Sequence, residues 1–156
     1  MADPDGVSTE SRRELVELDR GDCLRLLSKG VVGRVIFTRY ALPTAHPVNY
    51  LLDNEEIVFQ TGEGGALALA TRNAVIGFEV DDIDYRNRTG WSVVGVGRAY
   101  EVTDPDRLAD LTNRMPEPWA PGRTAHVIAL PLQQLTGRYL RVAESGDRSS
   151  GTATPP

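Results

Sequence analysis

Apolar and polar residues alternate in several short runs along this chain, and a period of two residues is typical of β-strands. The clearest run covers residues 31–39, in which Val31, Gly33, Val35 and Phe37 would share one face. Similar runs predict strands over residues 45–52, 56–61, 74–80, 89–102, 125–130 and 133–142. Most of the chain is therefore expected to form strands.

Three short helices are expected between these strands. Asp19 is a candidate N-cap for a helix that runs to Lys29, with Gly30 as a left-handed stop. Small residues predict a second helix over residues 66–70. Asp104, followed by Pro105 in the first turn, predicts a third helix that extends to about residue 113.

Turns are predicted at residues 40–43, at residues 53 and 54, and at the acidic residues 81–84. Pro43 and Pro47 place the start of the following strand near an edge or a bulge, because proline cannot donate a ladder hydrogen bond. Glycines 95 and 97 inside the longest strand indicate a bulge, a bend or a closely approached backbone.

Many short strands, three short helices and no long parallel β-α-β alternation predict a mainly antiparallel barrel with helices at its rim. The length of 156 residues is that of one domain. Residues 14–143 are expected to form this domain. The polar segments 1–13 and 144–156 are expected to be disordered.

Composition removes several classes of function. The net charge is −5 and no cluster of basic residues occurs, so a nucleic-acid partner is not expected. No apolar run approaches the roughly 20 residues that cross a bilayer, so no membrane partner is expected either. The polar, acidic start and the single cysteine, Cys23, indicate a cytoplasmic protein.

A glycine-rich loop, Thr61-Gly62-Glu63-Gly64-Gly65, lies where a predicted strand passes into a helix. Exposed backbone N–H groups gather at such a junction and suit an anion such as a phosphate. The alternative is a turn that needs positive φ, since glycine-rich turns are common.

Few other residues indicate chemistry. His46 is either a structural residue or a contact to a ligand ring, whereas His126 is interpreted as structural. Trp119, in the proline-bounded loop 115–122, is interpreted as core, as interface or as a lid over a flat ligand. The two histidines and Cys23 lack the spacing of metal ligands, so no metal site is expected. No catalytic residue can be assigned, because no nucleophile–base motif occurs.

The segments GRVIFT, PVNY, FQTGEGGALA, FEVDDID, GWSVVGVGRAYEV, PWAPGR and LTGRYL follow in one order. Together they resemble the pyridoxamine 5′-phosphate oxidase-like, FMN-binding split-barrel family, in the branch that includes nitroimidazole-resistance proteins. The resemblance covers roughly residues 18–141. It implies a six-stranded antiparallel split β-barrel with short peripheral helices, which forms a homodimer with FMN at the subunit interface.

The resemblance also implies the residues that hold the cofactor. The strand carrying PVNY would run beside the isoalloxazine ring, and the glycine-rich loop would approach the phosphate. Trp91 and Trp119 are candidates to come from the partner subunit. The implied cofactor-binding residues are His46, Pro47, Val48, Asn49, Gln60, Thr61, Gly62, Gly64, Gly65, Ala66, Leu67, Trp91 and Trp119.

One position departs from the pattern of the family. Relatives carry a Lys or Arg at the start of the short helix, where this chain has Ala66. A charge-assisted hydrogen bond to phosphate contributes about 1.5–3 kcal/mol, so its loss weakens binding about tenfold to a few hundredfold. Arg72, Arg123 and Arg138 are candidates to replace that charge.

Three hypotheses of function follow from the resemblance. The first is an FMN-dependent oxidoreductase acting on a small planar substrate, with the flavin performing the chemistry. The second is a reductase that uses an 8-hydroxy-5-deazaflavin coenzyme in the same groove. The third is a non-catalytic binding protein that has lost FMN and holds another flat ligand, such as haem.

Overall fold

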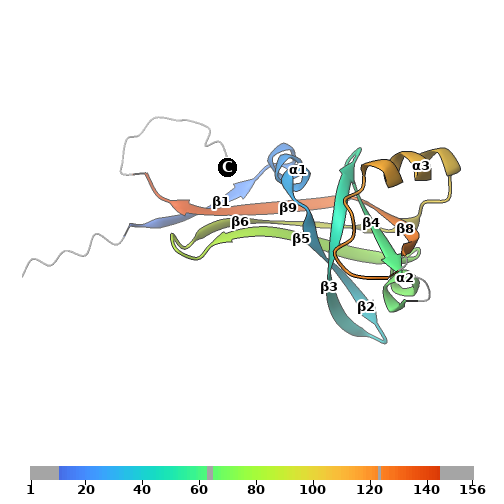
Figure 1. The fold of residues 1–156 in the computed structure, drawn as a ribbon. Helices are drawn as coiled ribbons and strands as arrows, with labels where there is room; N and C mark the ends of the chain where they lie inside the picture. Colours follow the sequence, from blue (N-terminus) through green and yellow to red (C-terminus); the bar gives the residue numbers. More distant parts are fainter. Residues whose placement is uncertain (1–10, 63–64, 123, 145–156) are drawn as a thin grey trace, which may run out of the picture.

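The computed structural model describes residues 11–62, 65–122 and 124–144. These residues form a mainly β structure with three short helices, as the sequence predicts (Figure 1). The elements in chain order are β1 (Arg13–Leu18), α1 (Arg20–Lys29), β2 (Val32–Arg39), β3 (Leu42–Asp53), β4 (Glu56–Gly62), α2 (Ala66–Thr71), β5 (Val75–Asp84), β6 (Thr89–Arg98), β7 (Tyr100–Glu101), α3 (Pro105–Arg114), β8 (Thr124–Pro131) and β9 (Gln134–Val142).

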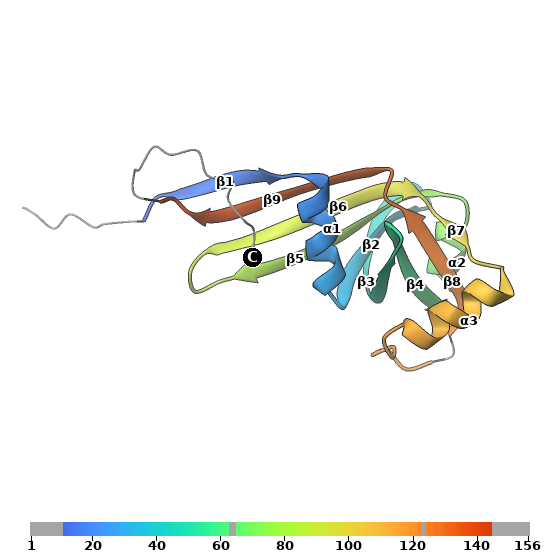
Figure 2. The ribbon, with the colours of Figure 1, turned by 90° about the horizontal axis from the view of Figure 1, so that it is seen from above.

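The strands form one antiparallel sheet in the order β1-β9-β6-β5-β2-β3-β4-β8-β7. Its β2–β3–β4–β8 part curls around the core, while β5, β6 and β9 run on together as a long arm (Figures 1 and 2). The described strands number nine rather than six. The expected strand over residues 89–102 divides into β6 and β7 at Ala99, whose N–H bonds to the carbonyl of Ala74 at 2.9 Å.

Strand β1 was not predicted. It begins at Arg13, the last residue of the segment expected to be disordered, and pairs along its whole length with β9. Its apolar residues are few and partly exposed, with Leu15 at 59% exposure. Strand β1 lies at the margin of the sheet and pairs only with β9, so few of its side chains are buried and its sequence shows little alternation of apolar and polar residues. The expected disordered segments 1–10 and 145–156 lie outside the described residues.

Two hydrophobic clusters hold the fold together. The main core lies on the inner face of the sheet and contains Phe59, Phe78 and Tyr50, with Cys23 and Leu26 from α1 packed on it. A second cluster lies between the sheet and α3. It consists of Val58, Val102, Leu111, Val127 and Ala129. Each fully buried Leu, Phe or Val contributes about 1.5–3 kcal/mol from burial of its apolar surface.

The capping of α1 was predicted correctly at its start and wrongly at its end. Asp19 Oδ1 accepts a hydrogen bond from the N–H of Asp22 at 2.8 Å. Gly30, however, has an extended backbone with φ −79°, so it is not a left-handed stop. The position needs glycine because a Cβ would overlap with the hydroxyl of Tyr50, which donates to the carbonyl of Leu27 at 2.6 Å. Burial raises the pKa of Tyr50.

The turns are tighter than predicted. Tyr40 and Ala41 take positive φ and form the whole β2–β3 turn, so Pro43 lies inside β3. Asn54 and Glu55 do the same between β3 and β4, one residue later than expected. Positive φ at both central residues matches the twist of a two-residue hairpin.

The acidic residues 81–84 are not a turn. They complete β5, and the turn follows at residues 85–88. Asp84 closes that turn by accepting hydrogen bonds from the N–H groups of Arg86 and Asn87, each at 3.0 Å, which lowers the pKa of its carboxyl. Carboxylates are tolerated at the end of β5 because the arm exposes them to water.

Candidate functional site

A groove of about 350 Å³ opens on the outer face of the sheet, the face that points away from the main core. Its floor comes from β3 and β4 and its roof from the chain that follows α3. The lining side chains are almost all apolar, and none of those in the described part of the chain is charged. They are Val32, Pro47, Val48, Asn49, Gln60, Gly62, Met115, Pro116, Pro118, Trp119, Ala120, Pro121 and Gly122.

The floor of the groove includes an unpaired strand edge. The N–H of Tyr50 donates to the carbonyl of Val31 at 3.1 Å, so the backbone groups of Tyr50 face β2. Successive residues of a strand direct these groups to opposite edges, so those of Asn49 and Pro47 face away from β2. On that side β3 pairs with β4 only over residues 50–53. We call the unpaired stretch, residues 43–49 within the described chain, the free edge of β3.

Two prolines occupy this free edge, as their sequence positions predict. Pro43, Ala45, Pro47 and Asn49 all direct their backbone groups to it by the same alternation. Proline has no N–H. The free edge therefore presents four carbonyl acceptors and only two backbone donors, the N–H groups of Ala45 and Asn49.

A hydrogen bond between described residues ties the roof of the groove to its floor. The N–H of Trp119 donates to Asn49 Oδ1 at 3.0 Å, and the indole of Trp119 is 74% exposed. The amide nitrogen of the same Asn49 side chain lies 3.5 Å from the carbonyl of Val31. Asn49 thus links β2, β3 and the loop at residues 115–122.

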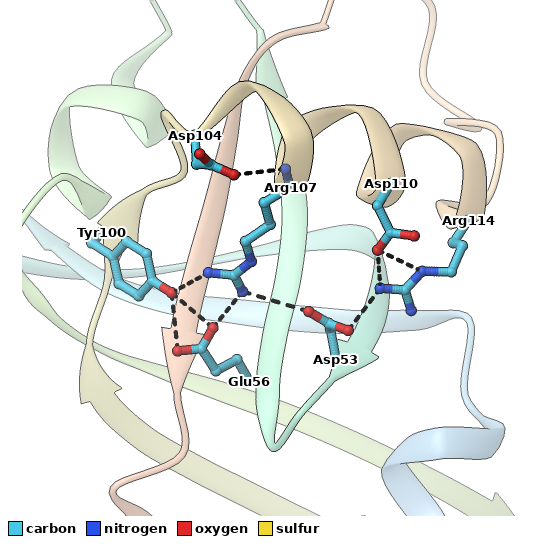
Figure 3. Close-up of polar contacts among 7 residues, drawn as sticks. All are labelled: Asp53, Glu56, Tyr100, Asp104, Arg107, Asp110 and Arg114. Carbon is cyan, nitrogen blue, oxygen red and sulfur yellow. Dashed lines mark hydrogen bonds and ion pairs between the residues drawn. The ribbon is translucent and has the colours of Figure 1, made fainter.

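A polar cluster anchors α3, from which the roof continues (Figure 3). Arg107 donates to the hydroxyl of Tyr100 and to Glu56 Oε2, each at 2.6 Å, and these hydrogen bonds raise the pKa of Arg107. Arg114 Nη2 bridges Asp53 Oδ1 and Asp110 Oδ2, both at 2.7 Å. The β3–β4 hairpin therefore holds both ends of α3, with Asp104 capping it as predicted.

A second polar cluster lies beside the end of β4. His126, the cross-strand partner of Thr61, lies 2.5 Å from Glu101 between Nδ1 and Oε1. Arg72, which follows α2, pairs with the other oxygen of Glu101 at 3.1 Å. The hydrogen bond with His126 lowers the pKa of the Glu101 carboxyl, and Arg72 adds to this. The hydroxyl of Thr61 is buried and has no hydrogen-bond partner among the residues that the structure describes.

The groove brings together six of the residues that the sequence indicated for a cofactor. Five come from neighbouring strands and the sixth roofs them. They are Pro47, Val48, Asn49, Gln60, Gly62 and Trp119.

Other predicted site residues lie elsewhere. His46 packs edge-on against the ring of Phe37, with 5.2 Å between ring centroids. Thr61 is buried, and Leu67 packs against the main core. Trp91 stands on the arm and packs against the main core, away from the groove.

The remaining predicted positions concern the glycine-rich loop. Gly65 is the N-cap of α2 and makes no side-chain cap, and Ala66 begins the helix. Gly64 lies outside the described residues, as do Glu63 and Arg123. The structure thus describes the two ends of the loop, at Gly62 and Gly65, and not its middle.

Sequence reasoning missed Val32 and, apart from Trp119, the groove residues of the loop at residues 115–122, among them Met115. Val32 is the apolar residue directly across from Asn49 in the β2–β3 pair. Met115 is the C-cap of α3. The signal for Met115 was the proline-rich loop that it opens, which was noted for Trp119 alone. Val32 could be assigned to the groove only from its pairing with Asn49, and the sequence alone does not reveal which residues of two strands pair.

We expect Asn49→Ala to loosen the roof of the groove. The variant removes the acceptor of the Trp119 N–H, a hydrogen bond that contributes about 1 kcal/mol, so the amide of Trp119 should exchange with solvent about fivefold faster. Amide hydrogen exchange followed by NMR measures this. Asn49→Asp keeps an acceptor oxygen and should retain the protection. Equal exchange in Asn49→Ala and the unchanged protein would show that other contacts hold the roof.

A curled antiparallel sheet that is open between β3 and β4, with a groove at the opening, defines the split-barrel class of fold. Residues 19–143 match the family described as pyridoxamine 5′-phosphate oxidase. The chain therefore belongs to the pyridoxamine 5′-phosphate oxidase family, which confirms the resemblance seen in the sequence.

Individual relatives agree with this membership. The uncharacterized protein Rv0080 of Mycobacterium tuberculosis is 41% identical over 136 residues, which is 84% of this chain and 89% of that protein. A solved FAD binding protein from Mycobacterium smegmatis is 29% identical with a TM-score of 0.65, covering 82% of this chain and all of that one.

A further structural neighbour shows the fold alone. The FAD and haem binding protein from Mycobacterium smegmatis is 17% identical, with a TM-score of 0.61 over 86% of this chain and 76% of that one.

None of the helices in the described part of the present chain is long and apolar enough to cross a membrane.

Proposed function

We propose that this chain is a flavin-dependent oxidoreductase that binds FMN in the groove at a homodimer interface and acts on a small planar substrate. The observation that carries the proposal is the free edge of β3 beneath the Trp119 roof. The pyrimidine edge of a flavin alternates donors and acceptors. The carbonyl groups of the free edge can accept hydrogen bonds from the donors of such a ring, and its N–H groups can donate to the acceptors of the ring. The side-chain amide of Gln60 lines the same groove.

The shape of the groove supports a flat aromatic ligand. Pro47, Pro116 and Pro118 give rigid apolar walls, and ligand sites are mostly apolar with a few polar groups that fix orientation. A bound flavin supplies hydride or electron-pair transfer. The protein residues bind and orient the ring and exclude water from one side of it, a role that needs no acid–base residue.

FAD is a second candidate for the same groove. The Mycobacterium smegmatis protein that shares 29% identity with this chain is named as FAD binding. FMN and FAD carry the same ring, so the free edge does not distinguish them. The additional nucleotide of FAD would extend beyond the groove, and titration with both flavins decides between them.

A second copy of the chain is the proposed cover of the outer face. Apolar side chains remain exposed there, with Leu15 at 59%, Ile36 at 38%, Val75 at 60% and Ile83 at 43%. Among them lies a charged group in which Arg34 contacts Glu79 at 2.8 Å and Asp81 at 3.6 Å. Mixed charges bordered by apolar residues suit a self-complementary two-fold contact.

Flavin titration of the purified, ligand-free protein tests the function. We expect FMN or FAD to bind with quenching of flavin fluorescence, and light scattering to report a dimer. Gln60→Trp should block the groove and abolish binding, because Gln60 lies on its floor. Asp106→Trp, on the exposed side of α3, is the matched control and should bind normally.

Several outcomes would contradict the proposal. A protein that takes up neither flavin is not a flavoprotein, and uptake of 8-hydroxy-5-deazaflavin instead would support the coenzyme alternative. Flavin binding that survives Gln60→Trp would place the site elsewhere. A monomer that binds flavin fully would remove the second copy from the site.

A further inference from the structure

Two carboxylates share one arginine on the outer face beside the groove. Arg34 Nη1 on β2 lies 2.8 Å from Glu79 Oε2 and 3.6 Å from Asp81 Oδ1, both on β5. We call these three residues the Arg34 cluster. Its formal charge is −1 when all three side chains are ionised, because two carboxylates meet one guanidinium. A net negative charge therefore stands next to a groove whose described lining side chains carry none.

The strand register shows how close the Arg34 cluster lies to the groove. Arg34 is directly across from Pro47, and Pro47 lines the groove. On its other side, Arg34 is directly across from Glu79. The Cβ atoms of directly opposed residues lie about 5 Å apart, so Glu79 stands about 10 Å from Pro47 on the same face. The cluster thus borders the groove without lining it.

Glu79 is the least exposed member of the cluster. The exposed fraction of its side chain is 18%, compared with 32% for Asp81 and 51% for Arg34. Burial is the largest cause that raises the pKa of the Glu79 carboxyl, and Asp81 raises it further against the opposite effect of Arg34. Val94 and Ser92, the partners of Glu79 and Asp81 on β6, are uncharged. A charge so placed acts on its surroundings more strongly than a charge in water.

Two further sets of opposite charges border the cluster. Lys29 and Asp82 line a hollow of about 300 Å³ together with Asp81. Arg138, on β9 and two strands from Asp81, is directly across from Glu17 on β1. Each set holds one positive and one negative side chain, so neither changes the net negative charge beside the groove.

Negative charge near a flavin ring opposes reduction of the ring. When the ring takes two electrons from an added reductant such as dithionite and one proton from water, it gains one negative charge. Repulsion by a neighbouring negative charge then weakens the binding of the reduced ring relative to the oxidised ring. Charge near the ring is one of the means by which a protein adjusts the electronics of its cofactor.

We propose that the Arg34 cluster, through the carboxylate of Glu79, lowers the reduction potential of a flavin bound in the groove. The inference rests on the proposed flavin-binding function and requires no residue of a second subunit. It makes the bound ring a stronger electron donor than it would be without the cluster, which suits a reductase. Glu79 acts through its charge and needs no contact with the ring.

The reduction potential of bound FMN tests the inference. The flavin is titrated without oxygen against a reference dye, at about pH 8, where glutamate is ionised. Glu79→Gln should favour the reduced ring about tenfold, which raises the two-electron potential by about 30 mV. Arg34→Gln leaves both carboxylates and should shift the potential downward. The phosphate of FMN has the same charge in both redox states, so it does not contribute to these differences.

Two more variants control the measurement. Glu17→Gln makes the same chemical change on the same face but four strands from β2, about 19 Å away, and should not move the potential. Asp81→Asn removes one negative charge from the cluster at a different residue. It should repeat the upward shift, so the inference can be tested even if Glu79→Gln does not fold.

The pH dependence gives a second readout. Below the raised pKa of Glu79 its carboxyl is protonated and uncharged, as glutamine is. The potentials of the unchanged protein and of Glu79→Gln should therefore differ at high pH and converge as the pH falls through this pKa. Proton uptake by the flavin itself is common to both proteins. A constant difference at every pH would overturn the role of the Glu79 charge.

The outcomes separate this inference from the proposed function. If the unchanged protein takes up no flavin, both fail. If flavin binds but Glu79→Gln leaves its potential unchanged, or if Glu79→Gln and Arg34→Gln shift it in the same direction, flavin binding stands and the inference is wrong. A shift that appears only with a change of oligomeric state in light scattering would show that the cluster acts through subunit contacts, and this also overturns the inference.

Discussion

Replacing Gly97 with alanine is expected to destabilise the fold by about 3 kcal/mol, at the upper end for overpacking. A Cβ at Gly97 would overlap with the carbonyl oxygen of Pro131, where β8 ends against β6. That backbone cannot withdraw easily. The N–H of Gln133 bonds to the same carbonyl at 3.0 Å, and the N–H of Leu132 bonds to Glu55 at 3.3 Å.

Urea unfolding followed by circular dichroism measures the loss. Gly77→Ala, on the neighbouring strand β5, is the matched control, because its Cβ would lie 3.4 Å from the Cβ of Ile36, in van der Waals contact and without overlap. That control should change stability by less than about 1 kcal/mol, since the lower entropy of its unfolded chain offsets small strain. Similar losses in both variants would mean that glycine matters there for strand propensity, not for the contact with Pro131.

Arg107→Met is expected to cost about 2 kcal/mol of stability and to weaken flavin binding as well. The variant leaves Glu56 without its charged partner and Asp53 with Arg114 alone, at side-chain exposures of 21% and 13%. Removing one member of a buried pair costs about 3–5 kcal/mol, and partial exposure to water reduces this figure. The flavin effect follows because α3 leads directly into the roof of the groove.

Chemical unfolding and flavin titration of the same preparation measure the two effects. Glu14→Gln removes an exposed pair with Arg141, in which Glu14 is 49% exposed, and it should cost less than about 1 kcal/mol. If Arg107→Met were no worse than this control, the cluster in Figure 3 would be a surface network without a role in anchoring α3.

The sequence correctly predicted those strands and helix caps that are determined by residues close together along the chain. The alternation of β2 was confirmed by buried Gly33, Val35 and Phe37, and the caps at Asp19 and Asp104 were confirmed by their hydrogen bonds. These features depend on residues that are neighbours along the chain. Residues 81–84 were assigned to a turn because acidic runs favour solvent, whereas an exposed arm lets a strand carry them.

The groove depended on contacts that local patterns do not contain. The PVNY and glycine-loop motifs led to the β3 and β4 floor residues. The free edge, however, exists only because β3 pairs with β4 over residues 50–53 and no further. Likewise, Arg107 could be recognised as an anchor of the roof only once Tyr100, Glu56 and Asp53 were seen around it.

The prolines of the free edge also bear on solubility. An exposed strand edge is a template on which a foreign strand can add, and such addition leads to aggregation. Pro43 and Pro47 remove two of the four donors that an incoming strand would need, so a continuous ladder cannot form there. The same edge can accept a small ring that needs only one or two hydrogen bonds. The backbone chemistry of this edge thus disfavours the addition of another strand, even in the absence of a ligand.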